Sequence, residues 1–178
     1  MEILIEYNFN VYKDLPVLPT NDEITDLHLK NCTQEIFDNL IIPPNINTIL
    51  FFTSDLEHLI IPAGVTYCNC ASLGLKTLSI PDSMEILYCD INCLQTLEIP
   101  FRCKLVNASY NKLTSIIAKT ELPDLIQLDV ENNRLDKIHF ENCPKLEYIV
   151  CDVGVVISKN LLEQMENIER IEFQNYNM

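Results

Sequence analysis

One spacing of apolar residues recurs along almost the whole chain and restricts the fold more than any other feature. In "LIQLDVENNRLDKI", residues 125–138, apolar side chains stand at offsets 0, 3, 5, 10 and 13 from Leu125. Neither a helix nor an alternating strand has this spacing, whereas near-regular copies are typical of stacked repeats. Eight copies start near residues 24, 46, 65, 84, 103, 125, 146 and 168. We therefore expect repeats over residues 24–178, preceded by an N-terminal cap or degenerate repeat over residues 1–23.

The first part of each copy predicts a short β-strand. Offsets 3 and 5, such as Leu128 and Val130, are apolar and should point inward, while offsets 2, 4 and 6 should point outward. A single copy cannot bury its apolar face alone. Successive strands should therefore stack into one parallel sheet, about 4.8 Å apart.

The turn after the strand and the return segment have their own signals. Only about eight residues follow offset 10 in a 19-residue copy, so a long helix does not fit there. An exception is residues 159–166, where Ser158 is a candidate N-cap for a short helix. Prolines that favour extended returns are Pro62, Pro81 and Pro100. Asparagines at offset 8, whose amides can satisfy buried backbone groups of the turn, are Asn92, Asn111 and Asn133.

The pattern L-x-x-L-x-L-x-x-N-x-L resembles the leucine-rich repeat and is most complete in residues 122–138. Copies that end in "LIIP", "LSIP" and "LEIP" are similar to the short IP-containing repeats of bacterial effectors and large DNA viruses. The resemblance implies an α/β-type repeat solenoid with a parallel β-sheet on the concave face and mostly extended segments on the convex face. It also implies a non-catalytic protein-protein interaction module that binds a partner, in this case a host protein, through the concave sheet face.

Charge and composition limit the kind of partner. The net charge of −14 disfavours nucleic acids and anionic membranes, because both are held mainly by lysine and arginine. The sequence has no signal-peptide pattern and no apolar stretch of about 20 residues, so we expect a cytoplasmic protein, in the host cytoplasm for a viral or effector protein. In that reducing compartment the eight cysteines should be free thiols.

The sequence predicts no catalytic residue, no metal and no cofactor. It contains no glycine-rich phosphate loop, no H-E-x-x-H and no nucleophile elbow, and its three histidines share no spacing with a nucleophile. A Cys89/Cys93 metal site stays open as an alternative. Cysteines at inward positions, where a free thiol acts as a small apolar core residue, are Cys68, Cys70, Cys89, Cys103 and Cys151.

The outward positions of the strands are the candidate binding surface. Several are apolar or aromatic where a solvated sheet would carry polar residues, and an acidic zone that also includes Glu172 follows toward the C-terminus. The expected partner therefore has an apolar anchor and a basic flank. The candidate partner-binding residues are Leu50, Phe52, Tyr67, Ile86, Tyr88, Leu105, Tyr110, Asp129, Glu131, Tyr148 and Asp152.

Three alternatives remain open from the sequence. The outward face could instead hold a second copy in a homodimer. The chain could be the substrate-recruiting subunit of a ubiquitin ligase, although residues 1–23 contain no recognisable ligase-docking motif. An enzyme built from cysteines and a histidine would keep reactive thiols in the native protein, whereas core thiols should react only after unfolding.

Overall fold

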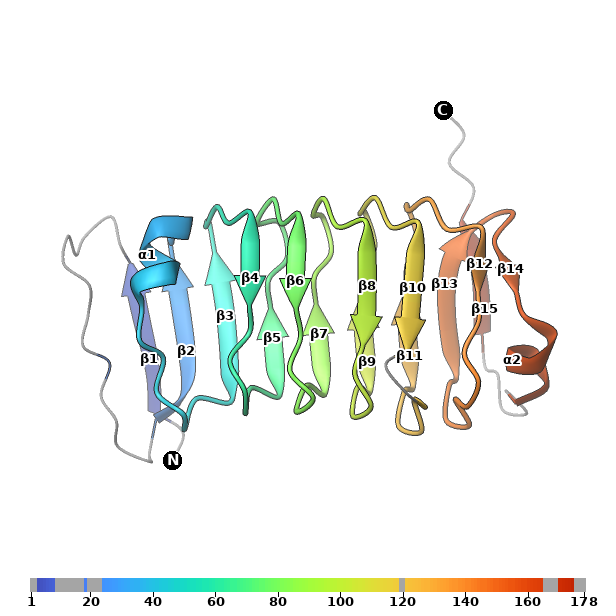
Figure 1. Cartoon of the computed structure of the whole chain (residues 1–178), viewed down its shortest axis with the longest axis horizontal. Helices are drawn as coiled ribbons and strands as arrows, with labels where there is room; N and C mark the ends of the chain where they lie inside the picture. The colour runs from blue at the N-terminus through green and yellow to red at the C-terminus, as the bar shows by residue number, and fades with distance from the viewer. Residues whose placement is uncertain (1–2, 9–17, 19–23, 119–120, 165–169, 175–178) are drawn as a thin grey trace.

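The computed structural model describes residues 3–8, 18, 24–118, 121–164 and 170–174. One strand from each copy joins a nine-stranded parallel sheet, and β1 extends it at the N-terminal edge (Figure 1). In order, the strands are β1 (Ile3–Asn8), β2 (Ile24–Lys30), β3 (Thr48–Phe52), β5 (Tyr67–Asn69), β7 (Ile86–Tyr88), β9 (Leu105–Asn107), β11 (Gln127–Asp129), β13 (Tyr148–Asp152) and β15 (Arg170–Gln174).

Strand pairing puts residues of equal offset side by side. From β2 to β15, the offset-2 residues form one row across the sheet. Ile5 and Tyr7 of β1 lie opposite Leu27 and Leu29 of β2. The predicted N-terminal cap otherwise falls mainly on residues 9–17 and 19–23, which lie outside the described residues, as do residues 168 and 169 of the last copy.

A second layer of extended segments lies behind the large sheet, and this arrangement confirms the expected solenoid. Its two-stranded pieces are β4 (His58–Ile60) with β6 (Thr77–Ser79), β8 (Thr96–Ile99) with β10 (Ser115–Ala118), and β12 (Lys137–Ile138) with β14 (Val156–Ile157). Pro62, Pro81 and Pro100 follow β4, β6 and β8, and each proline carbonyl accepts from the backbone N–H three residues later. The isoleucine-proline pairs therefore start the turn into the next copy.

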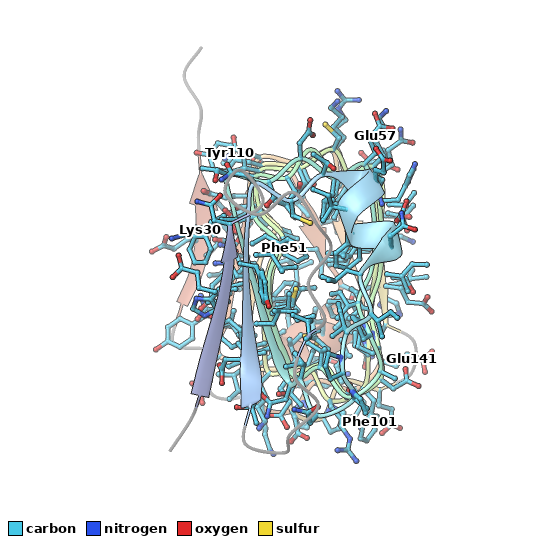
Figure 2. All side chains as sticks on the ribbon, turned by 90° about the vertical axis from the view of Figure 1, so that its left-hand side faces the viewer. Lys30, Phe51, Glu57, Phe101, Tyr110 and Glu141 are labelled. Carbon is cyan, nitrogen blue, oxygen red and sulfur yellow. The ribbon has the colours of Figure 1, made fainter. Side chains whose placement is uncertain are left out.

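The core fills the space between the two layers, where Figure 2 shows Phe51. Residues at offsets 3 and 5 of β2 to β13 are all buried, as the two-residue period of a strand requires. Their burial stabilises the stack because each copy covers the apolar face of its neighbours. They are Leu27, Leu29, Ile49, Phe51, Cys68, Cys70, Leu87, Cys89, Val106, Ala108, Leu128, Val130, Ile149 and Cys151.

Two short helices lie in return segments of 22-residue copies, which have room for one extra turn. The helix α1 (Gln34–Asn39) was not predicted from the repeat spacing, although Thr33 is a regular N-cap whose hydroxyl accepts from the backbone N–H of Ile36. Phe37 of α1 packs on Phe51, with ring centroids 5.6 Å apart. The helix α2 (Lys159–Gln164) lies within the predicted range 159–166, of which residues 165 and 166 lie outside the described part. In the described part of the chain, no helix combines the length and the hydropathy needed to cross a membrane.

Candidate protein-interaction surface

The turn asparagines connect neighbouring copies. Asn111 accepts from the backbone N–H of Leu94 in the preceding copy at 3.0 Å, and its amide donates to the Cys89 and Ala108 carbonyls. Asn92 and Asn133 make the same kind of contacts in their own turns. These buried or half-buried amides hold the strand ends in line and so set the shape of the surface that the strands present.

A second row of turn contacts, at offset 4, was missed by the sequence analysis. A side-chain oxygen there accepts from the backbone N–H two residues later, which is an Asx turn. The pairs are Asn69 with Ala71, Asn107 with Ser109, and Asp129 with Glu131. The repeated Asn, Asn, Asp at this offset was the available signal. The outward-facing carboxylate of Asp129 therefore also stabilises the turn, because one of its oxygens accepts from the backbone N–H of Glu131.

The outward side chains at offsets 2, 4 and 6 of β2 to β13, together with Glu172 of β15, form what we call the sheet face. Its N-terminal half carries aromatic contacts: the rings of Tyr67 and Tyr88 lie 6.0 Å apart, and Lys30 Nζ lies 5.7 Å from the centre of the Phe52 ring. Phe52 is 41% exposed. The other predicted apolar positions of this half are half-buried, namely Leu50, Tyr67, Ile86, Tyr88 and Leu105. The structure thus places these predicted residues side by side on β3, β5, β7 and β9.

Tyr110 lies beyond the end of β9, at the edge of the sheet face, where Figure 2 labels it. Its φ is 53°, and the offset-7 residues of five other copies share this left-handed conformation. Ile91 has φ 55° and is 55% exposed, so a β-branched side chain occupies a backbone conformation that strongly disfavours it. Ile91 lies outside the outward strand positions that were predicted to bind, and it adds an apolar side chain next to Tyr110 at this edge.

The C-terminal half of the sheet face is acidic. Desolvation raises the pKa of Asp129, and the carboxylates of Asp90, Glu172 and Asp152 raise it further. Desolvation is also the main cause of the raised pKa of Glu131, followed by the carboxylates of Asp129, Asp152 and Glu172. Asp152 has a structural role in addition, since its two carboxylate oxygens accept from the backbone N–H groups of Asn132 and Asn133. The carboxylates of this half are thus close together and partly desolvated.

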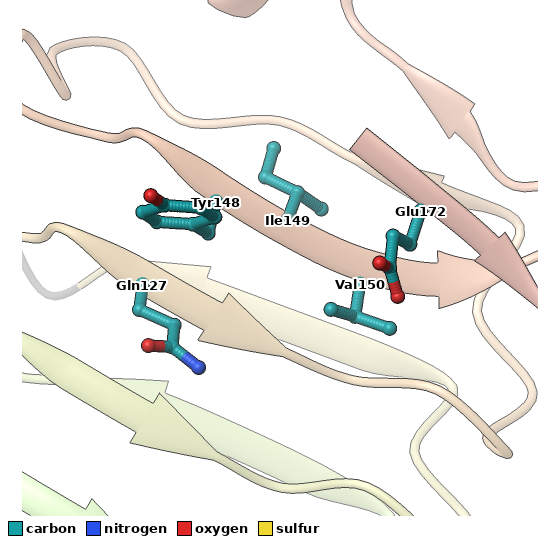
Figure 3. A pocket seen from close by; sticks show the side chains of 5 residues that line it. All are labelled: Gln127, Tyr148, Ile149, Val150 and Glu172. Carbon is teal, nitrogen blue, oxygen red and sulfur yellow. The ribbon is translucent and has the colours of Figure 1, made fainter. Parts of the chain in front are cut away.

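A cavity of about 290 Å³ opens on this acidic half (Figure 3). It lies across β11, β13 and β15 and is lined by Gln127, Tyr148, Ile149, Val150 and Glu172. Figure 3 shows the Tyr148 ring above the Gln127 side chain on the left, and the Val150 side chain beside the Glu172 carboxylate on the right. The site therefore combines apolar walls with amide and carboxylate acceptors, at the small end of the usual range of ligand pockets.

Most of the cysteines lie in the core. Cys68, Cys70, Cys89, Cys103 and Cys151 are buried, which confirms their interpretation as core residues. Desolvation raises the pKa of Cys103 to about 12 and that of Cys151 to about 11, which disfavours the nucleophilic thiolate. Cys93 is only partly buried. Within the described residues, no group of three or more His, Cys, Asp or Glu side chains could hold a metal ion.

Comparisons with known proteins show the fold. No family model and no curated protein matches the sequence. The chain is similar to the crystal structure of the leucine-rich repeat domain of APL1B, with a TM-score of 0.64 and 18% identity over 86% of this chain and 50% of that one. A leucine-rich repeat protein from Bacteroides ovatus matches with a TM-score of 0.35 and 15% identity, over 96% of this chain and 54% of that one. The match to the APL1B domain shows that the chain has the leucine-rich repeat fold. The chain spans about half the length of each of these two chains.

Proposed function

We propose that the chain is a non-catalytic module that binds a partner protein through its sheet face. The observation that supports this proposal most is the run of apolar and aromatic side chains on adjacent strands at outward positions. Contiguous apolar surface on a folded protein typically marks an interaction site, and tyrosine is enriched among the residues that dominate binding energy. The leucine-rich repeat fold, which commonly serves protein interaction, supports the same function.

The proposed contact surface has an apolar half and an acidic half. Repeats over residues 24–178 form the binding unit, with residues 1–23 as its N-terminal cap. The apolar contacts are Leu50, Phe52, Tyr67, Ile86, Tyr88, Leu105 and Tyr110, and the contacts of the acidic half are Asp129, Glu131, Tyr148 and Asp152.

We propose that the partner is a host protein, which the chain binds in the host cytoplasm. The likeness of the "LSIP" and "LEIP" copies to the short repeats of bacterial effectors and large DNA viruses supports this origin. The net charge of −14 supports a protein partner over nucleic acid or an anionic membrane.

Affinity capture with matched variants tests the proposal. The double variant Phe52→Asp with Tyr88→Asp places two charges on the apolar half and should reduce capture of the partner by roughly tenfold or more. The control is Ile60→Asp with Ile117→Asp, because these isoleucines are 73% and 51% exposed and lie on β4 and β10 of the opposite layer. Circular dichroism should show that both variants are folded. Equal capture by wild type and the face variant would reject the sheet face as the binding surface.

Self-association through the same face predicts a different result. Sedimentation equilibrium on the purified protein should give the 20.5 kDa monomer at micromolar concentration. A dimer that dissociates on Tyr88→Asp would instead assign the apolar half to a second copy of this chain.

A further inference from the structure

The cavity on the acidic half allows the chemistry of the partner to be specified, and this step rests on the proposed function of the sheet face. Among the five residues that line it, Glu172 carries a carboxylate, and Tyr148, Ile149 and Val150 are aromatic or aliphatic. Asp129 of β11 lies beside this wall, since it pairs with Val150 in the strand register. A lysine or arginine side chain suits such a site, because its methylene stem packs on apolar walls while its charged end reaches carboxylate and amide oxygens. An acidic side chain would meet Glu172 and the carboxylates beside it.

The distribution of charge over the neighbouring strands favours the same ligand. The outward positions of β7, β9, β11 and β13 contain neither lysine nor arginine. Among the described cations, Lys30 lies at the N-terminal end of the sheet face and forms an ion pair with Glu6. Three further ion pairs lie outside the sheet face, and they are Lys76 with Glu57, Lys104 with Glu85, and Lys145 with Asp124. In β15, Arg170 pairs with Tyr148 in the strand register. The acidic residues at outward positions of β7, β11, β13 and β15 are Asp90, Asp129, Glu131, Asp152 and Glu172.

The raised pKa values of Asp129 and Glu131 support a cationic ligand. Desolvation and neighbouring carboxylates disfavour the charged forms of both groups. A bound cation would stabilise those charged forms, so its binding should release protons near the raised pKa values and weaken as salt concentration rises.

We propose that the sheet face binds an extended partner segment that places one arginine or lysine side chain in the cavity and an apolar or aromatic side chain on the Tyr67–Tyr88 pair. The segment runs across the strands. The cavity is centred on β13, about three and a half strand spacings from the midpoint between β5 and β7, where the Tyr67–Tyr88 pair lies, and this is roughly 17 Å. An extended chain advances about 3.3 Å per residue, so the two anchors should be about five residues apart.

Peptide selection tests this proposal without assuming the motif. A library of random dodecapeptides is selected on the wild-type protein after counter-selection on the Phe52→Asp, Tyr88→Asp variant. The enriched peptides should contain an apolar or aromatic residue and a basic residue about five positions apart. One synthetic peptide with this motif is then titrated against protein variants.

The variants separate the cavity from general electrostatics. Glu172→Gln with Glu131→Gln should weaken peptide binding about tenfold and reduce its salt dependence. Glu141→Gln removes a charge from the opposite side of the molecule, where Figure 2 shows Glu141, and should leave binding nearly unchanged. Replacing the basic residue of the peptide by glutamine should cancel the difference between wild type and the double variant.

Three outcomes decide the matter. Basic peptides with the expected spacing that bind the Glu172→Gln, Glu131→Gln double variant more weakly than wild type support the proposal. Face-dependent peptides that lack a basic residue, or whose affinity is the same for the double variant and wild type, overturn it and leave the proposed function standing. No face-dependent peptide at all overturns both this proposal and the proposed function.

Discussion

The side-chain nitrogen of Asn111 donates to three backbone carbonyls, and its side-chain oxygen accepts from the backbone N–H of Leu94. Asn111→Ala would leave these groups without their partner in a buried turn, and we expect a loss of roughly 3 kcal/mol in the free energy of unfolding. Asn160→Ala, at an exposed position of α2, is the control and should change it little. Urea denaturation measures both. An Asn111→Ala protein as stable as the control would show that the turn satisfies its backbone groups in another way.

The left-handed backbone conformation of Ile91, with φ 55°, is unfavourable for a β-branched residue. Burial offsets little of this cost, because the side chain is 55% exposed. Asparagine tolerates the left-handed region much better, so Ile91→Asn should stabilise the protein by about 1 kcal/mol. The control Ile117→Asn changes an equally exposed isoleucine in β10, where the φ is not positive and asparagine is a poor strand former. Thermal unfolding should therefore show a higher Tm for the first variant and a lower Tm for the second.

Among the elements, the strands and the helix α2 were predictable, whereas the helix α1 and the Asx turns were not. The offsets alone gave the strand register, because the inward residues of every copy must meet the same core. The helix α1 was missed because its signal is one N-cap, Thr33, and one buried ring, Phe37, within a six-residue element. The Asx turns at offset 4 were missed because Asn69 and Asn107 can equally be surface residues. The cavity depends on how the Tyr148 and Glu172 side chains lie, and repeat spacing does not determine that.

The outward carboxylate of Asp129 on β11 predicts that the free energy of unfolding depends on pH. Because the folded-state pKa of Asp129 lies above its ordinary value, ionisation opposes folding, and stability should rise as pH falls from 7 through that raised pKa. Asp129→Asn removes the charge and keeps the acceptor for the Glu131 N–H, as Asn69 and Asn107 do in their turns. The variant should be more stable than wild type at pH 7.

The advantage of Asp129→Asn should shrink at a second, lower pH, below the raised pKa of Asp129, where the wild-type carboxylate is also protonated. Asp124→Asn is a control of opposite sign, since Lys145 holds the pKa of Asp124 below its ordinary value and removal of the charge should slightly destabilise the protein at pH 7. Urea denaturation at the two pH values decides. A destabilised Asp129→Asn protein at pH 7 would show that the carboxylate contributes more to the turn than its repulsion costs.

At the scale of the whole molecule, the stack buries the thiols together with the core. All cysteines except Cys93 are buried, so a thiol-modifying probe should label at most Cys93 in the native protein and all eight thiols in urea. Mass spectrometry of the labelled protein gives the count directly. Rapid labelling of Cys89 together with Cys93 in the native state would contradict the packed core and revive a thiol-based site.

The central claim, that the sheet face contacts a different protein, is tested most directly by photocrosslinking from matched positions. Benzoylphenylalanine replaces Phe52 on the sheet face or Phe101 in a turn away from it, residues that are 41% and 46% exposed. After irradiation with the partner present, we predict a crosslink to that partner from position 52 and none from position 101. Crosslinks from position 101 alone, or from position 52 only to a second copy of the chain, would contradict the claim.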